Sequence, residues 1–572
     1  MQNSNSLKID LGKYKKQYED SLSRVRKEKI VERIWQKDFT IWSSKPDEII
    51  NRLGWLESPS ASLASLQEIE GFVQTVKNDG FTHALLLGMG GSSLAPEVFR
   101  LTFGKKEDYL DLSVLDSTNP GAVLECSQKF NPAKTLYIVS TKSGGTVETF
   151  SFMKYFYNQT AAVLGKEIAG NHFIAITDPG SGLETIAKQL NFRKIFLNDP
   201  NIGGRYSALS LFGIVPAALA GVNVKDLLTR ALNTANANKN SILNGPDSSA
   251  ELGVIIGSLA NSGIDKVTFF TSRALSHFGI WAEQLIAEST GKIGKGILPV
   301  VGEEILSPGY YSNDRLFIYL KLAGDDSFDI KIDSLRTANF PTIEIALDDI
   351  YELGAEMFRW EIATAVASWL TGIQPFDQPN VESAKILARK MVQEYSKTGN
   401  LPKSNLALLE SGIEVYGNTT EKYLGNIING FLYDIELYDS VNKLKRYVAI
   451  QAYLKPCDEI SEALQILRTK IQKKYKAAVT VGYGPRFLHS TGQLHKGDGG
   501  NGLFIQILSN ITEDVPIPDE AGSSKSAMSF GVLINAQALG DSQALTDNGR
   551  KVLTLNLLSD EAGKINKLAE LI

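Results

Sequence analysis

Short apolar runs alternate with amphipathic stretches from about residue 80 onwards, and this rhythm constrains the fold more than any other feature of the chain. The first set of expected strands covers residues 83–88, 112–116, 135–141, 173–178 and 194–197. Strands separated by helical segments are typical of a parallel sheet with helices on its faces. We therefore expect a first α/β domain over residues 46–235, preceded by a helical segment over 1–45.

The same rhythm restarts after a polar break around residues 233–249, so a second α/β domain is expected over 236–396. Its expected strands are 266–272, 296–301, 316–322 and 342–346. Apolar residues at three- and four-residue spacing predict two helices, 350–370 and 381–395, that close this domain. A third region, 397–572, has expected strands at 477–482, 502–508 and 552–557 and is interpreted as an additional C-terminal α/β region.

Composition and charge exclude several classes of protein. The 572 residues carry a net charge of only −5 and their basic residues are scattered, so neither nucleic acid nor an anionic membrane surface is an expected partner. The longest apolar stretch, 208–224, is interrupted by glycine and proline, which predicts a buried helix and not a membrane span. Cys126 and Cys457 fit neither a disulfide framework nor a zinc spacing, and residues 1–29 lack the apolar core of a secretion signal. We expect a cytoplasmic protein.

Two segments rich in glycine and hydroxyl groups follow expected strands. One is Gly-Met-Gly-Gly-Ser-Ser at 88–93, and the other is Ser-Thr-Lys-Ser-Gly-Gly-Thr at 140–146. Backbone amides and hydroxyls at the start of a helix bind anions, and open α/β sheets bind ligands outside the carboxyl ends of their strands. The first segment alone is equally well explained as a tight turn without a ligand, since it lacks the lysine of a P-loop and full dinucleotide spacing. For the pair, the alternative is two polar surface turns. Together they predict a site for a phosphate monoester.

Two further segments carry groups suited to proton transfer. Arg205 lies in Gly-Gly-Arg-Tyr-Ser at 203–207, where a fixed guanidinium can stabilise an enediolate, although in isolation it is more simply a helix-end arginine. Gln284 and Glu288 are four residues apart on an expected helix and therefore face the same way. A carboxylate so placed can act as the base that moves a proton between adjacent carbons. An exposed surface glutamate is the commoner case, and Glu283 is the neighbouring alternative.

Lysine and histidine candidates lie further along the chain. A helix expected to begin in the segment 374–385 places Gln378 and Lys385 about two turns apart on one side, so that both can point into a cleft. The glycine-rich loop 482–497 contains two of the five histidines, His489 and His495. No nearby cysteine or carboxylate pair completes a metal-binding spacing, so no metal site is predicted.

In order along the chain, these segments resemble the motifs of the glucose-6-phosphate isomerase family over about residues 40–395. The family's two phosphate loops are similar to Gly91 and Ser92 and to Thr141, Lys142, Ser143 and Thr146. Its arginine motif is similar to 203–207, its base motif to Gln284 and Glu288, and its Phe-Asp-Gln…Lys signature to Phe376, Asp377, Gln378 and Lys385.

The resemblance implies two sugar-isomerase (SIS) domains with parallel sheets, a small-molecule sugar phosphate as substrate, no metal or other cofactor, and a homodimer. One departure concerns the family's ring-opening histidine, because no histidine lies between Glu288 and Lys385. The segment around His489 is similar to that family loop moved downstream, as in the divergent isomerase half of fused transaldolase/glucose-6-phosphate isomerase proteins. His489 fits the loop best, and His495 is the second candidate.

The resemblance also implies a reaction, the reversible isomerisation of glucose 6-phosphate and fructose 6-phosphate in glycolysis and gluconeogenesis. Phosphate is expected on the two loops, and His489 and Lys385 are expected to assist ring opening. Glu288 is then expected to move the proton through a cis-enediol, with Arg205 stabilising the negative charge. Two alternatives stay open, an isomerase that also accepts mannose 6-phosphate and a non-catalytic phosphosugar-binding regulator.

Overall fold

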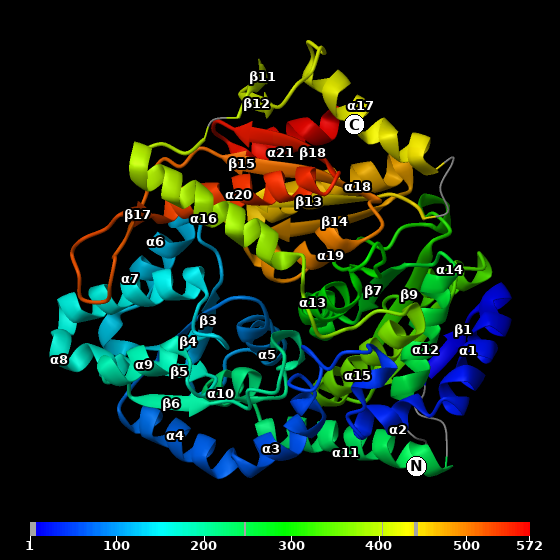
Figure 1. Ribbon diagram of the computed structural model, residues 1–572, viewed down its shortest axis with the longest axis horizontal. Helices are drawn as coiled ribbons and strands as arrows, with labels where there is room; N and C mark the ends of the chain where they lie inside the picture. Colours follow the sequence, from blue (N-terminus) through cyan, green and yellow to red (C-terminus); the bar gives the residue numbers. More distant parts are fainter. Residues whose placement is uncertain (1–6, 245–247, 403, 440–443) are drawn as a thin grey trace.

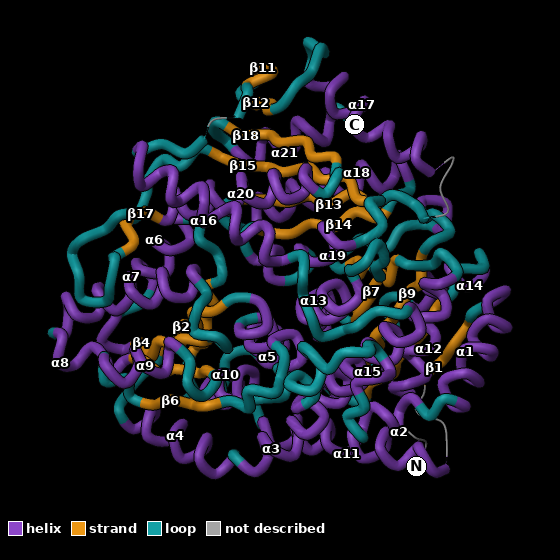
Figure 2. Tube along the Cα trace, in the orientation of Figure 1, coloured by secondary structure: helices purple, strands orange, loops and turns teal. Residues whose placement is uncertain are grey.

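Three α/β units make up the fold of this protein. The computed structural model describes residues 7–244, 248–402, 404–439 and 444–572. In Figure 1 the first unit lies at the lower left, the second at the lower right and the third at the top. Figure 2 shows the strands of the sheets enclosed by helices, as expected for parallel sheets whose connections cross over their faces.

The first unit is built on a five-stranded, fully parallel sheet. Its strands, in spatial order, are β3 (Asp111–Leu115), β2 (His83–Gly88), β4 (Thr135–Ser140), β5 (Phe173–Thr177) and β6 (Lys194–Leu197). Its helices are α3 (Ser58–Ala64), α4 (Leu66–Asn78), α5 (Leu94–Phe103), α6 (Pro120–Lys129), α7 (Val147–Leu164), α8 (Lys166–Ala169), α9 (Gly182–Gln189), α10 (Leu211–Leu219) and α11 (Val224–Asn244). All five expected strands are confirmed to within one residue at each end.

The second unit has a five-stranded sheet with one antiparallel edge. Its strands, in spatial order, are β1 (Leu7–Asp10), β10 (Thr342–Leu347), β9 (Arg315–Leu322), β7 (Lys266–Thr271) and β8 (Leu298–Val300), and β1 is the antiparallel one. Its helices are α1 (Lys15–Lys27), α2 (Ile30–Trp35), α12 (Ser248–Asn261), α13 (Phe278–Thr290), α14 (Asp329–Thr337) and α15 (Leu353–Thr371). The four strands expected here are confirmed to within two residues.

The third unit has a six-stranded sheet whose first two strands are antiparallel. Its strands, in spatial order, are β11 (Leu406–Glu410), β12 (Ile413–Tyr416), β18 (Lys551–Leu557), β15 (Gly502–Ser509), β13 (Tyr447–Tyr453) and β14 (Ala478–Tyr483). Its helices are α17 (Leu424–Asp439), α18 (Asp458–Tyr475), α19 (Gly492–Gly497), α20 (Phe530–Asp547) and α21 (Glu561–Glu570). A small pair, β16 (Pro516–Ile517) and β17 (Met528–Ser529), precedes α20.

The parallel strands of all three units follow one order. If the strands of each unit are numbered along the chain, the second lies beside the first on one side and the third and fourth lie on the other: β3-β2-β4-β5, β8-β7-β9-β10 and β14-β13-β15-β18. Such a sheet opens a crevice between its first and third strands, at their carboxyl ends, where the direction of winding reverses. In the first unit this crevice lies between β2 and β4.

Three expectations about the chain's organisation are wrong. Residues 233–249, expected as a polar break, are mostly helical, because α11 runs to Asn244 and α12 begins at Ser248, and residues 245–247 lie outside the described part. The helical segment expected over 1–45 also contains β1, which extends the second sheet, and residues 1–6 lie outside the described part. The third concerns α16 (Val381–Thr398), which was expected to close the second unit and instead packs along α20 of the third (Figure 1).

Apolar packing joins the first two units into one body. A single hydrophobic core contains one face of each of their sheets together with α10, α11, α12 and α15. The large side chains of Trp55, Trp281 and Trp360 are fully buried in this core. The expected buried helix in 208–224 is α10, which lies in the same core. Among the described residues, no helix is both long and apolar enough to cross a membrane.

Candidate active site

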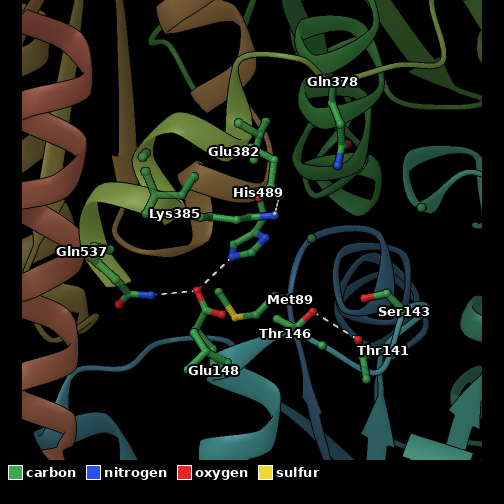
Figure 3. Close-up of a pocket in the computed structure, with 18 of the residues that line it drawn as sticks. Met89, Thr141, Ser143, Thr146, Glu148, Gln378, Glu382, Lys385, His489 and Gln537 are labelled. Atoms are coloured by element: carbon green, nitrogen blue, oxygen red, sulfur yellow. Dashed lines mark hydrogen bonds and ion pairs between the residues drawn. The ribbon is translucent and has the colours of Figure 1, made fainter. Parts of the chain in front are cut away.

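A pocket of about 710 Å³ lies where the three units meet. The loops after β2 and β4 form one wall, α13 and the Arg205 segment form a second, and α16, α20 and the His489 loop complete it. All twelve residues expected at the site line this pocket: Gly91, Ser92, Thr141, Lys142, Ser143, Thr146, Arg205, Gln284, Glu288, Gln378, Lys385 and His489. Figure 3 shows part of the wall, with side chains from all three units.

The two hydroxyl-rich loops meet at the crevice between β2 and β4. The Ser140 hydroxyl donates a 2.9 Å hydrogen bond to the carbonyl of Ser92, which fixes one loop against the other. Thr141 and Thr146 lie 3.1 Å apart, oxygen to oxygen, across the second loop (Figure 3). Helix α7 begins directly after Thr146, so its partial positive charge faces the same place. The two loops thus bring hydroxyl groups and the start of a helix to one place, which is what binding an anion requires.

Two hydroxyls of these loops are available to a ligand, whereas the lysine is already engaged. Within the described chain, the side chains of Ser92 and Ser143 make no hydrogen bond. The Lys142 ammonium is bound to the Asp178 carboxylate and donates to the carbonyl of Pro200 at 2.8 Å. Lys142 therefore adds positive charge at the rim of the pocket but has two protein partners of its own.

Close backbone approach explains the glycines of the first loop. A Cβ at Gly91 would lie 2.0 Å from the carbonyl oxygen of Gly204, next to Arg205. Gly90 has a φ of +55°, and a Cβ there would lie 3.0 Å from the Cβ of His489. The loop is thus inserted between the arginine segment and the histidine loop.

A buried carboxylate and a buried guanidinium face each other at the opposite wall. Glu288 Oε1 lies 3.2 Å from Arg205 Nη1, with side chains only 7% and 4% exposed. Gln284 lies one turn earlier on α13, as expected, and donates both to Glu288 Oε2 at 3.1 Å and to the carbonyl of His489 at 2.8 Å. The amide of Gln284 therefore links the base candidate to the histidine loop.

The expected placement of Gln378 and Lys385 on one helix is wrong, although both line the pocket. Helix α16 begins at Val381, and Gln378 lies in the preceding turn. Pro379 follows Gln378, and a residue before proline is disfavoured in helical conformation. Lys385 is on the helix and its Nζ lies 3.1 Å from Oε1 of Glu382 (Figure 3).

Of the two histidine candidates, only His489 lines the pocket. Its Nε2 lies 3.0 Å from Oε1 of Glu148, a buried residue in the first turn of α7. Gln537 of α20 donates to the same oxygen at 2.7 Å, and Figure 3 shows both side chains pointing at it. His495 is 2% exposed and packs against the ring of Phe504, and its burial holds its pKa well below the usual range.

Burial raises the pKa of Glu148, but the charge and hydrogen bond of His489 outweigh it, so the net pKa of this carboxyl is lowered. Glu148 is therefore a carboxylate at neutral pH, and it can orient the imidazole and stabilise its protonated form. Neither Glu148 nor Gln537 was expected from the sequence. The position of Glu148, two residues after Thr146 at the start of a helix, was the only available signal.

Glu283, the alternative carboxylate on α13, does not line the pocket. Its Oε1 accepts a long 3.5 Å hydrogen bond from the hydroxyl of Ser490. Burial raises its pKa to about 7, although Arg468 and Arg486 act in the opposite direction. The structure thus places Glu288, and not Glu283, opposite the guanidinium.

This arrangement suits one kind of chemistry. An anion-binding crevice can hold a phosphate monoester, and a carboxylate paired with a guanidinium can move a proton beside a carbonyl while charge develops on oxygen. An imidazole oriented by a carboxylate can act as a second acid or base on the same ligand.

A family model described as phosphoglucose isomerase matches residues 66–296, which include both phosphate loops, Arg205 and Glu288. A probable glucose-6-phosphate isomerase of Methanococcus maripaludis is 27% identical over 395 residues, which cover 60% of this chain and 85% of that protein. The segments that carry Lys385 and His489 lie outside the family-model match.

Solved structures share the fold. A hypothetical protein from Thermus thermophilus superposes with a TM-score of 0.58 at 24% identity, covering 67% of this chain and 99% of that one. A glucose-6-phosphate isomerase from Chlamydia trachomatis superposes with a TM-score of 0.50 at 19% identity, covering 64% of this chain and 78% of that one.

Proposed function

Because the chain is a divergent member of the glucose-6-phosphate isomerase family, we propose that it catalyses the reversible isomerisation of glucose 6-phosphate and fructose 6-phosphate. The observation that carries the proposal is the buried pair of Glu288 and Arg205, 3.2 Å apart, in one pocket with two hydroxyl-rich loops. A base and an electrostatic partner beside an anion site are what an aldose-ketose isomerisation of a sugar phosphate requires.

Substrate phosphate docks in the crevice between β2 and β4. The free hydroxyls of Ser92 and Ser143 and the start of α7 provide its hydrogen-bond donors. Thr141 and Thr146 line the same wall, and Lys142 adds positive charge at its rim. This fixes one end of the sugar and leaves its carbonyl end toward α13 and the His489 loop.

The cyclic sugar is opened by His489 with assistance from Lys385. The imidazole exchanges a proton with the ring oxygen or the anomeric hydroxyl, and Glu148 stabilises the imidazolium that forms in the cycle. Lys385 supplies a donor from α16 on the same side of the pocket. Gln284 and Gln378 are substrate-binding residues beside the reacting carbons.

Glu288 then carries the isomerisation step. It removes the proton from C2 of the open-chain aldose, and the resulting cis-enediolate bears negative charge that Arg205 stabilises. Glu288 returns the proton to C1. The C2 hydroxyl gives up its proton as the carbonyl forms at C2, and O1 takes up a proton, so that the net change is one hydrogen moved from C2 to C1 and one from O2 to O1. Atoms and charge balance without a metal or a redox cofactor.

We propose a cytoplasmic enzyme that forms a homodimer, on the strength of the family resemblance. All catalytic groups named above come from one chain, so turnover per chain should not need the partner. Specific activity is therefore expected to stay constant when the protein is diluted through the range in which mass photometry shows the dimer dissociating. A loss of activity in step with dissociation would contradict this.

The function is tested by supplying fructose 6-phosphate to the purified chain in the presence of a chelator and following glucose 6-phosphate and mannose 6-phosphate together. Glucose 6-phosphate is the expected product. Glu288→Gln should lower kcat by about 10² to 10⁴-fold, whereas the matched variant Glu283→Gln should retain turnover. Phosphosugar binding without turnover would instead identify a regulator. Formation of mannose 6-phosphate at a rate comparable to that of glucose 6-phosphate would show that the enzyme also accepts mannose 6-phosphate.

A further inference from the structure

Lys292 carries a buried amine directly behind the proposed active site. It follows the last turn of α13, and its side chain is only 3% exposed. Its Nζ donates to the carbonyl of Gln374 at 2.7 Å and to Oδ1 of Asp377 at 2.7 Å. It does not line the pocket, so its effect on a substrate has to pass through these two partners.

The turn that Lys292 holds also orients Arg205. Nη2 of Arg205 donates to the carbonyl of Pro375 at 2.6 Å and to the carbonyl of Asp377 at 2.8 Å. Nε of Arg205 donates to the hydroxyl of Ser289 at 3.0 Å. Nη1 then faces Glu288 at 3.2 Å and also donates, at 3.4 Å, to Oε1 of Gln378 in the same turn.

Besides Lys292 and Arg205, the 374–378 turn is held by the ring of Phe376, which is buried in the hydrophobic core against Trp42 and Tyr206. It lies between the end of α15 and the start of α16 and belongs to no helix or strand. The side-chain oxygen of Gln374 accepts from the backbone amides of Phe376 and Asp377, which shapes the turn internally. Lys292 is the residue that ties this shape to α13, the helix that carries Glu288.

The amine of Lys292 can make its two hydrogen bonds in either protonation state. Burial and the neighbouring charge of Arg205 lower the pKa of this amine to about 7. A neutral amine keeps two N–H groups, and Lys292 has two acceptors at hydrogen-bond distance. Both hydrogen bonds can therefore persist above and below neutral pH.

We propose that Lys292 is a positioning residue for the isomerisation, clamping the 374–378 turn so that Arg205 presents Nη1 to Glu288 and to the developing enediolate. The inference rests on the proposed function. Its consequence is selective: losing the clamp weakens stabilisation of the transition state and leaves phosphate binding intact, because the phosphate loops lie on the other wall.

The test compares Lys292→Met with Lys295→Met. Lys295 is a matched control, because it lies in the same turn and donates at 2.7 Å to the carbonyl of Thr371, and within the described chain it makes no hydrogen bond to the 374–378 turn. Lys292→Met should lower kcat about 10- to 100-fold with KM changed less than about threefold. The inhibition constant of a hydroxamate analogue of the enediolate should rise in proportion to the loss of kcat/KM, and that of inorganic phosphate should not change.

Asp377→Ala provides a second variant that removes one of the two hydrogen bonds of Lys292 and leaves the bond to the Gln374 carbonyl. The double variant with Lys292→Met should be about as slow as Lys292→Met alone, because Lys292→Met already removes the bond to Asp377. Equal kcat for Lys292→Met and Lys295→Met, a rise in the phosphate inhibition constant, or effects that multiply would each overturn the clamp. The activity of the wild-type chain is measured before any variant is made. If the wild-type chain is inactive, the proposed function itself is refuted.

Discussion

Glu148 Oε1 lies 3.0 Å from Nε2 of His489, although the two residues are 341 positions apart and belong to the first and third units. The contact is partly buried, with the side chains of Glu148 and His489 6% and 15% exposed. Gln537, from a third element, holds the same carboxylate oxygen. The histidine proposed to open the sugar ring is therefore oriented across a junction between units.

Glu148→Gln should lower kcat about 10- to 100-fold, because the imidazole loses both its orienting acceptor and the charge that stabilises its protonated form. KM should change little, since the phosphate loops are unaltered. The measurement is steady-state kinetics with glucose 6-phosphate. Glu125→Gln, at an exposed pair with Lys455, is the control and should behave as wild type. An unchanged kcat in Glu148→Gln would remove this residue from the mechanism.

Ser143→Ala should raise KM for fructose 6-phosphate about tenfold and leave kcat nearly unchanged, because a hydrogen bond to a charged phosphate is lost equally in ground and transition states. Ser60 is exposed on α3 and its hydroxyl donates to the carbonyl of Glu57, so Ser60→Ala gives the control. A fall in kcat at constant KM would argue against a role in holding phosphate.

Gly91→Ala should destabilise the protein by about 1–3 kcal/mol and lower activity, because the new Cβ would lie 2.0 Å from the carbonyl oxygen of Gly204 and displace the loop. Gly71→Ala on α4 is the opposite case. A Cβ there meets no heavy atom within 4 Å, and alanine is favoured over glycine in a helix by roughly 0.5–1 kcal/mol. Thermal unfolding of the two variants should shift in opposite directions, and equal shifts would contradict the packing argument.

Glu283 gives the stability of the protein a dependence on pH. Its pKa is raised to about 7 by burial, against roughly 4.3 in an unfolded chain. Between these values the folded state binds more protons than the unfolded state, so this residue makes stability fall as pH rises through that window. Glu283→Gln removes the effect. The variant should have the same free energy of unfolding as wild type near pH 4.5 and exceed it by about 1–3 kcal/mol at pH 8. The measurement is chemical denaturation at both pH values. A wild-type protein more stable than the variant at pH 8 would contradict this account of Glu283.

Much of the fold could be predicted because its parallel strands are buried on both faces. Such strands are near-continuous apolar runs bounded by glycine and polar residues, as at 83–88 and 135–140. β1, only four residues long with alternating burial, carries a much weaker signal. The apolar run of β13 was readable in the same way as the others, and it was missed.

The apolar stripe of α16 predicts a helix with one buried face, but it does not say which unit covers that face. Backbone contact of α16 with Gly540 of α20 decides the matter, and it depends on a turn at Pro379 that redirects the chain. Site residues that share a local motif, such as Gln284 and Glu288, were predictable from spacing. Gln537 and Lys292 make their contacts with distant segments, and spacing along the chain contains no information about them. Glu148 had only the weak signal of its place just after Thr146.

The separation of Glu148 from His489 along the chain also has a consequence for synthesis. A ribosome completes both phosphate loops long before it reaches the histidine loop, because His489 lies 341 residues after Glu148. At roughly 5–20 residues per second this delay lasts on the order of half a minute. A nascent chain can therefore acquire its anion-binding crevice well before it can turn over a sugar, so catalytic activity reports that the third unit has emerged and docked.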